Sequence, residues 1–287
     1  MEIFQKKQEI LDKISTLRNS GLTIGFVPTM GALHFGHIAL IKRAQIENDV
    51  VVVSIFVNPT QFNNKTDFEK YPHPIEKDKE LLTNALCNIL WLPDVNDIYP
   101  NDYRKHKNTQ LELGNLGKVL EGNYRIGHFE GVLEVVSILF DNVQPTRAYF
   151  GKKDFQQLAI VQQLTKSCYP SVEIVSCETL REKNGLAMSS RNERLTVEGK
   201  EKAALIYETL NLIKNTLNSA TDVEEIINKQ IINLELNNFK IDYLAVVESN
   251  KLTNILKPEA QQNITICIAT YLEEVRLIDN IQFIWKP

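Results

Sequence analysis

The sequence predicts an α/β fold: a Rossmann-like, doubly wound parallel sheet with a smaller C-terminal α+β domain. Short β-branched runs alternate with helical stretches up to about residue 176, which is typical of a parallel sheet built from βαβ units. The run at 49–57 is almost continuously apolar, as in a strand covered on both faces. From about residue 180, long polar helices precede strand-like runs, so we expect domains at 1–179 and 180–287.

Apolar spacing places the elements of the first domain. The helix expected at 36–48, for example, has Leu40, Ile41 and Ala44 on one face. Strands are expected at 22–27, 49–57, 88–93, 147–151 and 172–176. Helices are expected at 36–48, 77–86, 130–143 and 155–168. Because such sheets bind ligands beyond the carboxyl ends of their strands, polar residues after the first, second and fourth strands are candidate site residues.

The second domain is expected to hold helices at about 197–217 and 222–236 and strands at 241–247 and 264–270. No internal repeat or low-complexity tract interrupts this order. In the first domain, the polar segment 63–74 contains two prolines and is predicted to be a mobile loop over a site.

Composition and charge exclude several classes of protein. The 287 residues carry a formal net charge of −4, without the clustered lysine and arginine that would hold a nucleic acid. No apolar run approaches the roughly 20 residues that cross a bilayer. The stretch MEIFQKKQEILDK lacks the pattern of a signal peptide. The four cysteines form no C-x-x-C pair, so we expect reduced, buried thiols. Together these features predict a cytoplasmic protein that binds neither nucleic acid nor membrane.

Two histidines, His34 and His37, stand where a predicted strand passes into a helix, with Gly31 and Gly36 beside them. Residues three apart share a face of a helix, and the N–H groups at a helix start already favour anions. Two imidazoles in this place can donate to phosphate oxygens as charge builds in a phosphoryl-centred transition state. Two alternatives stay open here: the pair only caps the turn, or it binds a metal, although no third ligand is near in sequence.

Polar residues also follow two other predicted strands. Asn58 and Gln61 are expected to point into the cleft, where neutral amides suit a hydroxyl or carboxylate ligand; a polar turn around Pro59 is the alternative. Lys153 is placed to reach a phosphate or carboxylate. Asp154 can cap the next helix or meet a ribose hydroxyl or a cation. A capped helix with solvated lysines is the alternative for this pair.

The tripeptide Ser189, Ser190 and Arg191 lies just past the expected domain boundary. Hydroxyls followed by a guanidinium suit a polyphosphate, because arginine offers a rigid fork of donors. An ordinary surface loop is the alternative. All of these groups fall where a two-domain nucleotide-binding fold places its site.

Taken in order, these motifs resemble those of the pantoate–β-alanine ligase family, which shares an H-x-G-H signature with class I aminoacyl-tRNA synthetases. The matching segments are PTMGALHFGH (28–37), VVVSIFVNPTQF (51–62), GHFEGV (127–132), GKKDFQQL (151–158), GLAMSSRNERL (185–195) and RLIDN (276–280). They span nearly the whole chain, and the ordered set is far more specific than one H-x-G-H.

The resemblance implies a two-step reaction. Pantoate attacks the α-phosphorus of ATP to form pantoyl adenylate and pyrophosphate, and β-alanine then attacks the activated carbonyl to give pantothenate and AMP. Mg²⁺ is implied as the companion of ATP. The resemblance also implies a homodimer formed through the N-terminal domain, with VVVSIFV near the contact.

The resemblance further implies roles for single residues. His37, His34 and Lys153 are the implied catalytic residues. The implied ATP-binding residues are Met30, Gly31, Ala32, Leu33, His34, Phe35, Gly36, His37, Gly151, Lys152, Lys153, Asp154, Leu180, Met188, Ser189, Ser190 and Arg191. Pantoate is assigned to Gln61, Gln157 and Asn58, β-alanine to Gln61, and Mg²⁺ to Asp78.

Four residues depart from the family pattern: Lys152 replaces Glu, Ile126 replaces Pro, His73 replaces Arg and Asn184 replaces Asp. Lys152 adds positive charge beside the site, so it is expected to change ATP affinity rather than abolish activity. The other three affect only individual loop assignments.

Two other functions stay open on the sequence. The first is a nucleotidyltransferase that acts on a phosphorylated substrate such as phosphopantetheine and makes a dinucleotide; Asn58 and Gln61 favour a carboxylic acid instead. The second is an RNA-binding remnant of a tRNA synthetase. The negative net charge and the intact His34, His37 and Arg191 argue against it.

Overall fold

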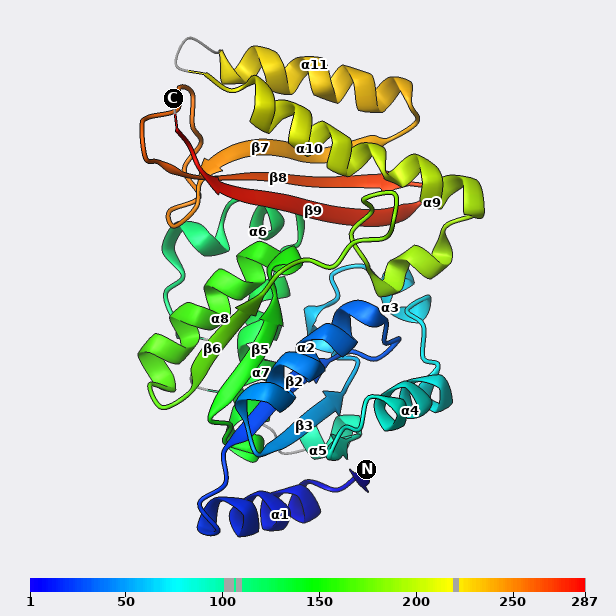
Figure 1. Ribbon diagram of the computed structural model, residues 1–287, viewed down its shortest axis with the longest axis vertical. Coiled ribbons are helices and arrows are strands. Elements are labelled where there is room, and N and C mark those ends of the chain that lie inside the picture. Colours follow the sequence, from blue (N-terminus) through cyan, green and yellow to red (C-terminus); the bar gives the residue numbers. More distant parts are fainter. Residues whose placement is uncertain (101–105, 107–109, 219–221, 287) are drawn as a thin grey trace.

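The computed structural model describes residues 1–100, 106, 110–218 and 222–286. Within these ranges the strands form a parallel sheet in the order β1-β4-β3-β2-β5-β6 and an antiparallel sheet in the order β7-β8-β9. Figure 1 shows the parallel sheet in the lower half of the molecule and the antiparallel sheet above it. The predicted α/β fold with a smaller C-terminal α+β domain is confirmed.

The first part of the chain alternates strands and helices, as predicted. Its strands are β1 (Glu2–Phe4), β2 (Ile24–Thr29), β3 (Val50–Ile55), β4 (Ile89–Trp91), β5 (Arg147–Gly151) and β6 (Glu173–Cys177). Its helices are α1 (Lys7–Asn19), α2 (Phe35–Glu47), α3 (Lys65–Glu69), α4 (Ile75–Asn84), α5 (Val95–Ile98), α6 (Glu121–Tyr124), α7 (His128–Val143) and α8 (Phe155–Cys168). Single 3-10 turns are η1 (Pro59–Gln61), η3 (Gly114–Gly117) and η4 (Lys152–Asp154).

The second part follows β6, and the domain boundary expected after residue 179 lies just beyond that strand. It contains η5 (Ser190–Arg194), α9 (Val197–Ala203), α10 (Leu205–Thr216), α11 (Val223–Leu236), β7 (Lys240–Glu248), β8 (Asn263–Leu272) and β9 (Val275–Ile284). The single helix expected at 197–217 is thus divided at Ala204. The sequence reading also missed β1, α1 and β9, the last because polar residues interrupt its apolar pattern.

Side chains of the parallel sheet alternate between two apolar cores, as in a doubly wound fold. Phe26 and Val52 face the core shared with α1, α7 and α8, whereas Val27 and Val53 face the core shared with α2 and α4. The second sheet packs one face against α10 and α11. Its other face meets the first domain, where Cys267 lies near Leu120 and Phe155.

The interior position of β3 bears on the dimer contact expected near the segment VVVSIFV. This strand lies between β2 and β4, and its residues Val51–Ser54 are buried within the chain itself. Within the segment VVVSIFV, only Ile55 and Val57 are partly exposed. A dimer contact near this segment stays a prediction, and it would have to involve the end of the segment rather than the strand.

Three other expectations can be compared with the structure. The segment 63–74, predicted as a mobile loop, contains the helix α3, whose first turn is capped by Asn64, and includes the buried Tyr71. All four cysteines are free, but only Cys87 and Cys267 are buried, while the other two are partly exposed. None of the helices in the described ranges is long and apolar enough to span a membrane.

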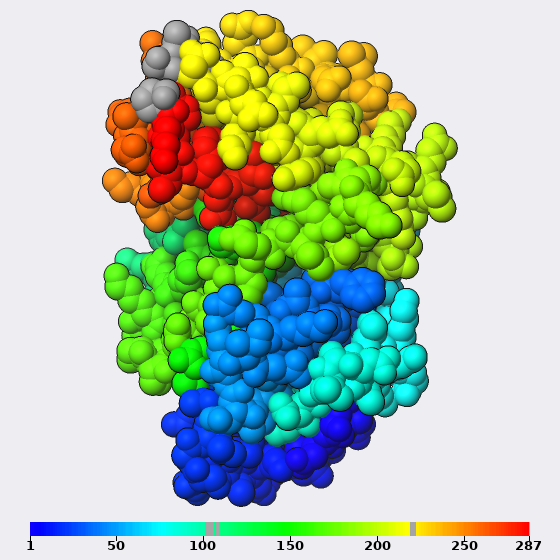
Figure 2. Space-filling view, viewed as in Figure 1, coloured from blue at the N-terminus to red at the C-terminus, as the bar shows by residue number. Residues whose placement is uncertain are grey.

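The strand order sets the place of the site. From β2 the chain builds outward through β3 and β4 on one side, and β5 pairs with the opposite edge of β2. The crevice at such a switch point is where open α/β sheets bind ligands. In Figure 2 the blue and cyan surface around it meets the yellow-green surface of the second domain.

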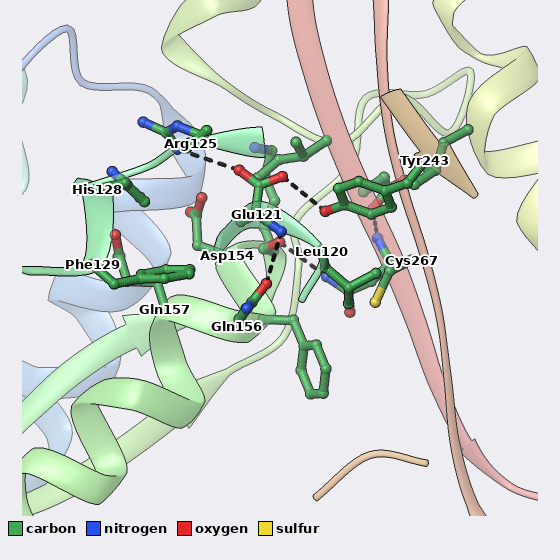
Figure 3. A pocket seen from close by; sticks show the side chains of 16 residues that line it. Leu120, Glu121, Arg125, His128, Phe129, Asp154, Gln156, Gln157, Tyr243 and Cys267 are labelled. Carbon is green, nitrogen blue, oxygen red and sulfur yellow. Dashed lines mark hydrogen bonds and ion pairs between the residues drawn. The ribbon is translucent and has the colours of Figure 1, made fainter. Parts of the chain in front are cut away.

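A buried ionic cluster joins the two domains, centred on Glu121 at the start of α6. Its two carboxylate oxygens accept hydrogen bonds from Arg276 of β9, each at 2.8 Å, and the hydroxyl of Tyr243 on β7 donates a third at 2.8 Å. Figure 3 shows Glu121 between Arg125 on one side and Tyr243 on the other. Burial alone would raise the pKa of the Glu121 carboxyl, but the hydrogen bonds and charge of Arg276, with Arg125, hold it at about 2.

We expect Glu121→Gln to remove part of the acid sensitivity of folding. In the folded protein the pKa of Glu121 is about 2, below its ordinary value of 4.5. The stabilisation by this carboxylate is therefore complete above about pH 4.5 and is lost as the pH falls toward 2. The variant should be less stable at pH 7 and should lose stability less steeply between pH 4.5 and 2.

Urea unfolding over this pH range measures the effect. The same Glu→Gln change at exposed Glu235 on α11 is the control, because it removes a surface carboxylate without touching the cluster. If Glu121→Gln and the wild type lose stability with the same slope, the cluster is not a source of acid sensitivity.

Candidate active site

A cleft opens at the carboxyl ends of β2, β3 and β5, facing the second domain, with a cavity volume of about 220 Å³. One wall is apolar and comes mainly from α7, through Val132, Val135, Val136 and Leu139. The polar side chains that line it include His34, His37, Asn58, Gln61, Lys153, Asp154, Gln157, Ser189, Ser190 and Arg191. The cleft therefore combines an apolar surface with convergent donors, as small-molecule sites usually do.

The loop after β2 is held in place by Gly31 and Asp78. Gly31 has a φ of +77°, and a Cβ there would lie 2.9 Å from the side chain of Ile55. The carboxylate of Asp78, which is 1% exposed, accepts hydrogen bonds from the backbone N–H groups of Ala32 at 2.8 Å and Leu33 at 2.7 Å. Asp78 is not among the residues that line the cleft, so the geometry gives its assignment to Mg²⁺ no support.

His34 and His37 form a reciprocal cap on the first turn of α2. The Nδ1 atom of His34 accepts from the backbone N–H of Gly36 at 3.1 Å, and the Nδ1 atom of His37 accepts from the backbone N–H of His34 at 3.3 Å. Only glycine fits at position 36, since a Cβ would lie 2.8 Å from the His34 ring. Because each Nδ1 is an acceptor, each neutral ring carries its proton on Nε2.

Both imidazoles are neutral at pH 7. Burial, followed by the charge of Lys153, lowers the pKa of His34 to about 4. Burial, His34 and Lys153 together hold the pKa of His37 well below its ordinary value. The pair thus caps the helix and at the same time keeps one N–H donor on each ring. Among the described residues, no third histidine, cysteine or carboxylate joins the pair as a metal-binding group.

We expect both rings to remain neutral and protonated on Nε2 in the ligand-free protein well below pH 6.5. Burial disfavours the charged ring, and each Nδ1 is occupied by a backbone N–H. Nitrogen chemical shifts of ¹⁵N-labelled imidazoles between pH 8 and pH 5 measure this, with signals assigned through His34→Gln and His37→Gln. Titration of either ring near its ordinary value of 6.5 would contradict the hydrogen-bond arrangement.

Gln61 is held from several sides at the edge of the cleft. It is 7% exposed, and its side-chain amide donates to the sulfur of Met30 at 2.7 Å. Its backbone carbonyl accepts from Nδ1 of His128 at 2.7 Å and from Arg125 at 3.5 Å. His128, from the motif GHFEGV, is neutral at pH 7 because burial, with the charge of Arg125, lowers its pKa to about 3. No role for His128 was anticipated from the sequence.

Asn58 uses its amide mainly within the protein. Its oxygen accepts from Tyr99 at 2.9 Å and from the hydroxyl of Thr60 at 3.0 Å, and its nitrogen donates to the carbonyl of Gly131 at 3.1 Å. The nitrogen also lies 3.4 Å from the side-chain oxygen of Gln61. Asn58 lines the cleft, but these contacts make it a support for Gln61 rather than a free ligand group.

Both lysines of the motif GKKDFQQL lie in the turn η4, but their side chains make different contacts. Lys153 and Asp154 line the cleft, whereas Lys152 turns away and forms an ion pair with Glu178. The extra charge of Lys152 is therefore neutralised at the surface. Asp154 stands at the N-cap of α8, but among the described residues its side chain makes no capping hydrogen bond, so of the readings left open the cap is not the one seen. Gln157 of α8 also lines the cleft.

The second domain closes the cleft with its Ser-Ser-Arg segment. Ser189 caps η5 by accepting from the backbone N–H of Arg191, and the hydroxyl of Ser190 donates to the carbonyl of Ala32 at 2.9 Å. Arg191 and Arg194 both pair with Asp67 of α3 at 2.8 Å. The segment 63–74 is thus tied to the Ser-Ser-Arg segment above the cleft.

Most of the expected site residues meet in this cleft. Those that line it are Met30, His34, Gly36, His37, Asn58, Gln61, Gly151, Lys153, Asp154, Gln157, Leu180, Met188, Ser189, Ser190 and Arg191. Those outside its lining are Gly31, Ala32, Leu33, Phe35, Asp78 and Lys152. Leu33 is packed into a core, and the side chain of Phe35 is 68% exposed.

The sequence reading missed part of the lining. These residues are Pro28, Thr29, Leu40, Phe56, Tyr71, Val132, Val135, Val136, Leu139, Tyr149, Phe150, Glu178 and Thr179. Most are apolar or aromatic, and their pattern does not differ from that of core residues. The available signal is position in the matched motifs: Pro28, Thr29, Phe56 and Val132 lie within them, and Phe150 directly precedes one.

Three departures from the family pattern lie around the cleft without blocking it. The side chain of Asn184 accepts from the backbone N–H of Leu186 and donates to the carbonyl of Lys200, so it orders its own turn. Ile126 is 83% exposed, and His73 packs edge-on against Tyr71. None of the three is among the residues that line the cleft.

The parallel sheet and the cleft at the carboxyl ends of its strands are typical of α/β enzymes that bind a nucleotide. A family model described as Pantoate-beta-alanine ligase matches residues 2–282. A curated protein from Cytophaga hutchinsonii named Pantothenate synthetase is 46% identical over 266 residues, which are 91% of this chain and 92% of that protein. The chain belongs to the pantoate–β-alanine ligase family.

Solved structures agree with this family. Pantothenate synthetase from Thermus thermophilus superposes with a TM-score of 0.87 at 38% identity, covering 98% of this chain and 99% of that one. Pantoate-beta-alanine ligase from Francisella tularensis, in complex with beta-gamma ATP and beta-alanine, gives 0.81 at 37% identity, covering 98% and 97%. The family decides for a ligase against the two alternatives, a transferase acting on a phosphorylated substrate and an RNA-binding remnant.

Proposed function

We propose that this protein condenses pantoate with β-alanine to pantothenate, a coenzyme A precursor, through pantoyl adenylate. The observation that carries this proposal is the reciprocal cap of His34 and His37, which leaves two neutral N–H donors beside Lys153. The amides of Gln61 and Gln157 line the same cleft. Donors for phosphate and amides for a hydroxy acid are what an acid-adenylating site requires.

The first step needs alignment more than a base. A carboxylate oxygen of pantoate, already charged at neutral pH, bonds to the α-phosphorus as the bond from that phosphorus to pyrophosphate breaks. The Nε2–H groups of His34 and His37 donate to the phosphate oxygens that gain charge. Lys153 and Arg191 add charged donors, which are stronger than neutral ones.

In the second step, the amine of β-alanine attacks the carbonyl carbon of the adenylate. The bond from this carbon to the AMP oxygen breaks, AMP leaves with the electron pair, and the nitrogen releases a proton to solvent. We place β-alanine at Gln61, where the acyl group of pantoate already lies. The apolar wall of α7 keeps water away from the reactive carbonyl.

The remaining assignments follow the cleft. ATP lies along Met30, Gly36, Gly151, Asp154, Leu180 and Met188, with its triphosphate toward His34, His37, Lys153, Ser189, Ser190 and Arg191. Pantoate lies at Gln61 and Gln157, with Asn58 behind. Gly31, Ala32 and Leu33 shape the loop, and the second domain closes over the site.

Mg²⁺ fits this site as a companion of the ATP phosphates. It usually takes one or two protein carboxylates together with phosphate oxygens. Of the carboxylates that line the cleft, Glu178 is paired with Lys152, and exposed Asp154 is the one we assign. The ion would supply neutralisation of phosphate charge. The homodimer and the cytoplasmic location stay predictions from the sequence.

Isotope exchange between pyrophosphate and ATP tests the first step directly. We expect exchange that requires pantoate and Mg²⁺ but not β-alanine. His37→Ala should lower its turnover by roughly a hundredfold or more, while ATP affinity changes little, because the donor acts mainly in the transition state. His106→Ala, which removes a histidine paired with Asp141 away from the cleft, is the control. Absence of exchange while ATP still binds, or equal losses in turnover and ATP affinity, would contradict the proposal.

Because Asp67 pairs with Arg191 and Arg194, we expect removal of its charge to raise the affinity for ATP. If Arg191 binds the triphosphate, ATP must displace Asp67 from it. We expect Asp67→Asn to bind ATP roughly two- to fivefold more tightly, as befits a partly exposed ion pair. Titration calorimetry measures the affinity, with Asp12→Asn on the exposed face of α1 as the control. Unchanged or weaker binding would show that Asp67 does not compete with ATP.

A further inference from the structure

The segment RLIDN resembles the family's tail but has no role in the reaction described so far. It lies on β9, and its three polar side chains each make a specific contact. Arg276 binds Glu121, Asp279 forms a two-bond ion pair with Arg181, and Asn280 reaches the first domain.

Asn280 touches the turn that carries Lys153. Its side chain is 6% exposed, and its Nδ2 atom donates to the backbone carbonyls of Lys152 and Lys153, each at 2.9 Å. Both carbonyls belong to η4, between β5 and α8. One amide from the second domain therefore fixes the backbone of the cleft's lysine in the first.

The other side-chain contact of η4 described above is the ion pair of Lys152 with Glu178. Among the described residues, no side chain caps η4 at Gly151, and none caps α8 at Asp154. The orientation of Asn280 is in turn fixed, because its backbone N–H donates to Asp279 at 2.8 Å and its side-chain oxygen lies 3.4 Å from the amide of Gln282. The direction of support thus runs from β9 to η4.

We propose that Asn280 is a positioning residue for the first step: by holding the carbonyls of Lys152 and Lys153, it aims the Lys153 ammonium at the phosphates of ATP. This inference rests on the proposed role of Lys153. A displacement of about 1 Å at a reacting group costs up to about a hundredfold in rate, so one pair of hydrogen bonds is enough to matter.

Asn280→Asp is the first test variant, because it keeps the shape of the side chain and replaces the donor by oxygens that repel the two carbonyls. We expect pyrophosphate exchange to turn over roughly tenfold more slowly or worse, with the KM for pantoate within about twofold of the wild type. Asn263→Asp, on the exposed start of β8, makes the same chemical change away from η4 and serves as the control.

Asn280→Ala is the second variant, because the aspartate also buries a charge. A cavity of about 30 Å³ lies beside Lys153 and Asn280, with room for a water that binds the freed carbonyls. This variant should fold and should lose turnover in the same direction, by a smaller factor. Thermal unfolding of both variants monitors the fold.

A double-mutant cycle with Lys153→Ala separates positioning from a general structural role. If Asn280 acts through Lys153, then Asn280→Ala should cost little further turnover once Lys153 is gone. A second measurement needs no turnover: the charge of Lys153 lowers the pKa of His34, so Asn280→Ala should raise that pKa toward its value in Lys153→Ala.

The outcomes are distinct. Wild-type turnover in both Asn280 variants, or equal losses with and without Lys153, would overturn the positioning role and leave the proposed reaction intact. Wild-type exchange in Lys153→Ala would overturn the proposed role of Lys153, and the role of Asn280 with it. Reduced turnover that is not additive with Lys153→Ala, together with the raised pKa of His34, supports the inference.

Discussion

The reciprocal hydrogen bonds between His34, His37 and the first turn of α2 are the constraint on which the site depends. They occupy both Nδ1 atoms and so decide which nitrogen of each ring carries the proton. A neutral imidazole would otherwise present either a donor or an acceptor to a ligand. The absence of a side chain at Gly36 and the pairing of Asp78 with the preceding loop make this arrangement possible.

The second constraint is that the cleft is built from both domains. Ser190 reaches back to the loop after β2, and Asn280 reaches the turn after β5. Glu121 and Arg276 are also buried together at the junction, which is favourable only because each charge has several partners. The domains are therefore held in register by polar contacts whose geometry is specific, rather than by apolar contact alone.

The fold could be predicted from the sequence because the parallel sheet has a strong local signature. The apolar run of β3 and the helical spacing of α8 can each be recognised within a short stretch of consecutive residues. It also located His34, His37 and Gln61, because strand ends are where such folds bind ligands. What it could not reach are contacts between distant residues of ordinary type, such as Asp78 with Ala32 or Asn280 with Lys153. β9 was not predicted for the same reason, because its polar residues are explained by their partners elsewhere in the fold and not by any periodicity.

The contacts across the junction join residues that are far apart in the chain: Asn280 lies 127 residues from Lys153, and Arg276 lies 155 residues from Glu121. Each domain has its own apolar core, formed without these contacts. Residues so far apart in the chain can make these contacts only when the two domains are docked, and ordering the chain between them costs entropy. We therefore expect the junction to open on heating before either core melts, so that catalysis is lost while the helical signal is still intact. Loss of activity on heating would then report the separation of the domains, whereas circular dichroism would report the unfolding of each domain.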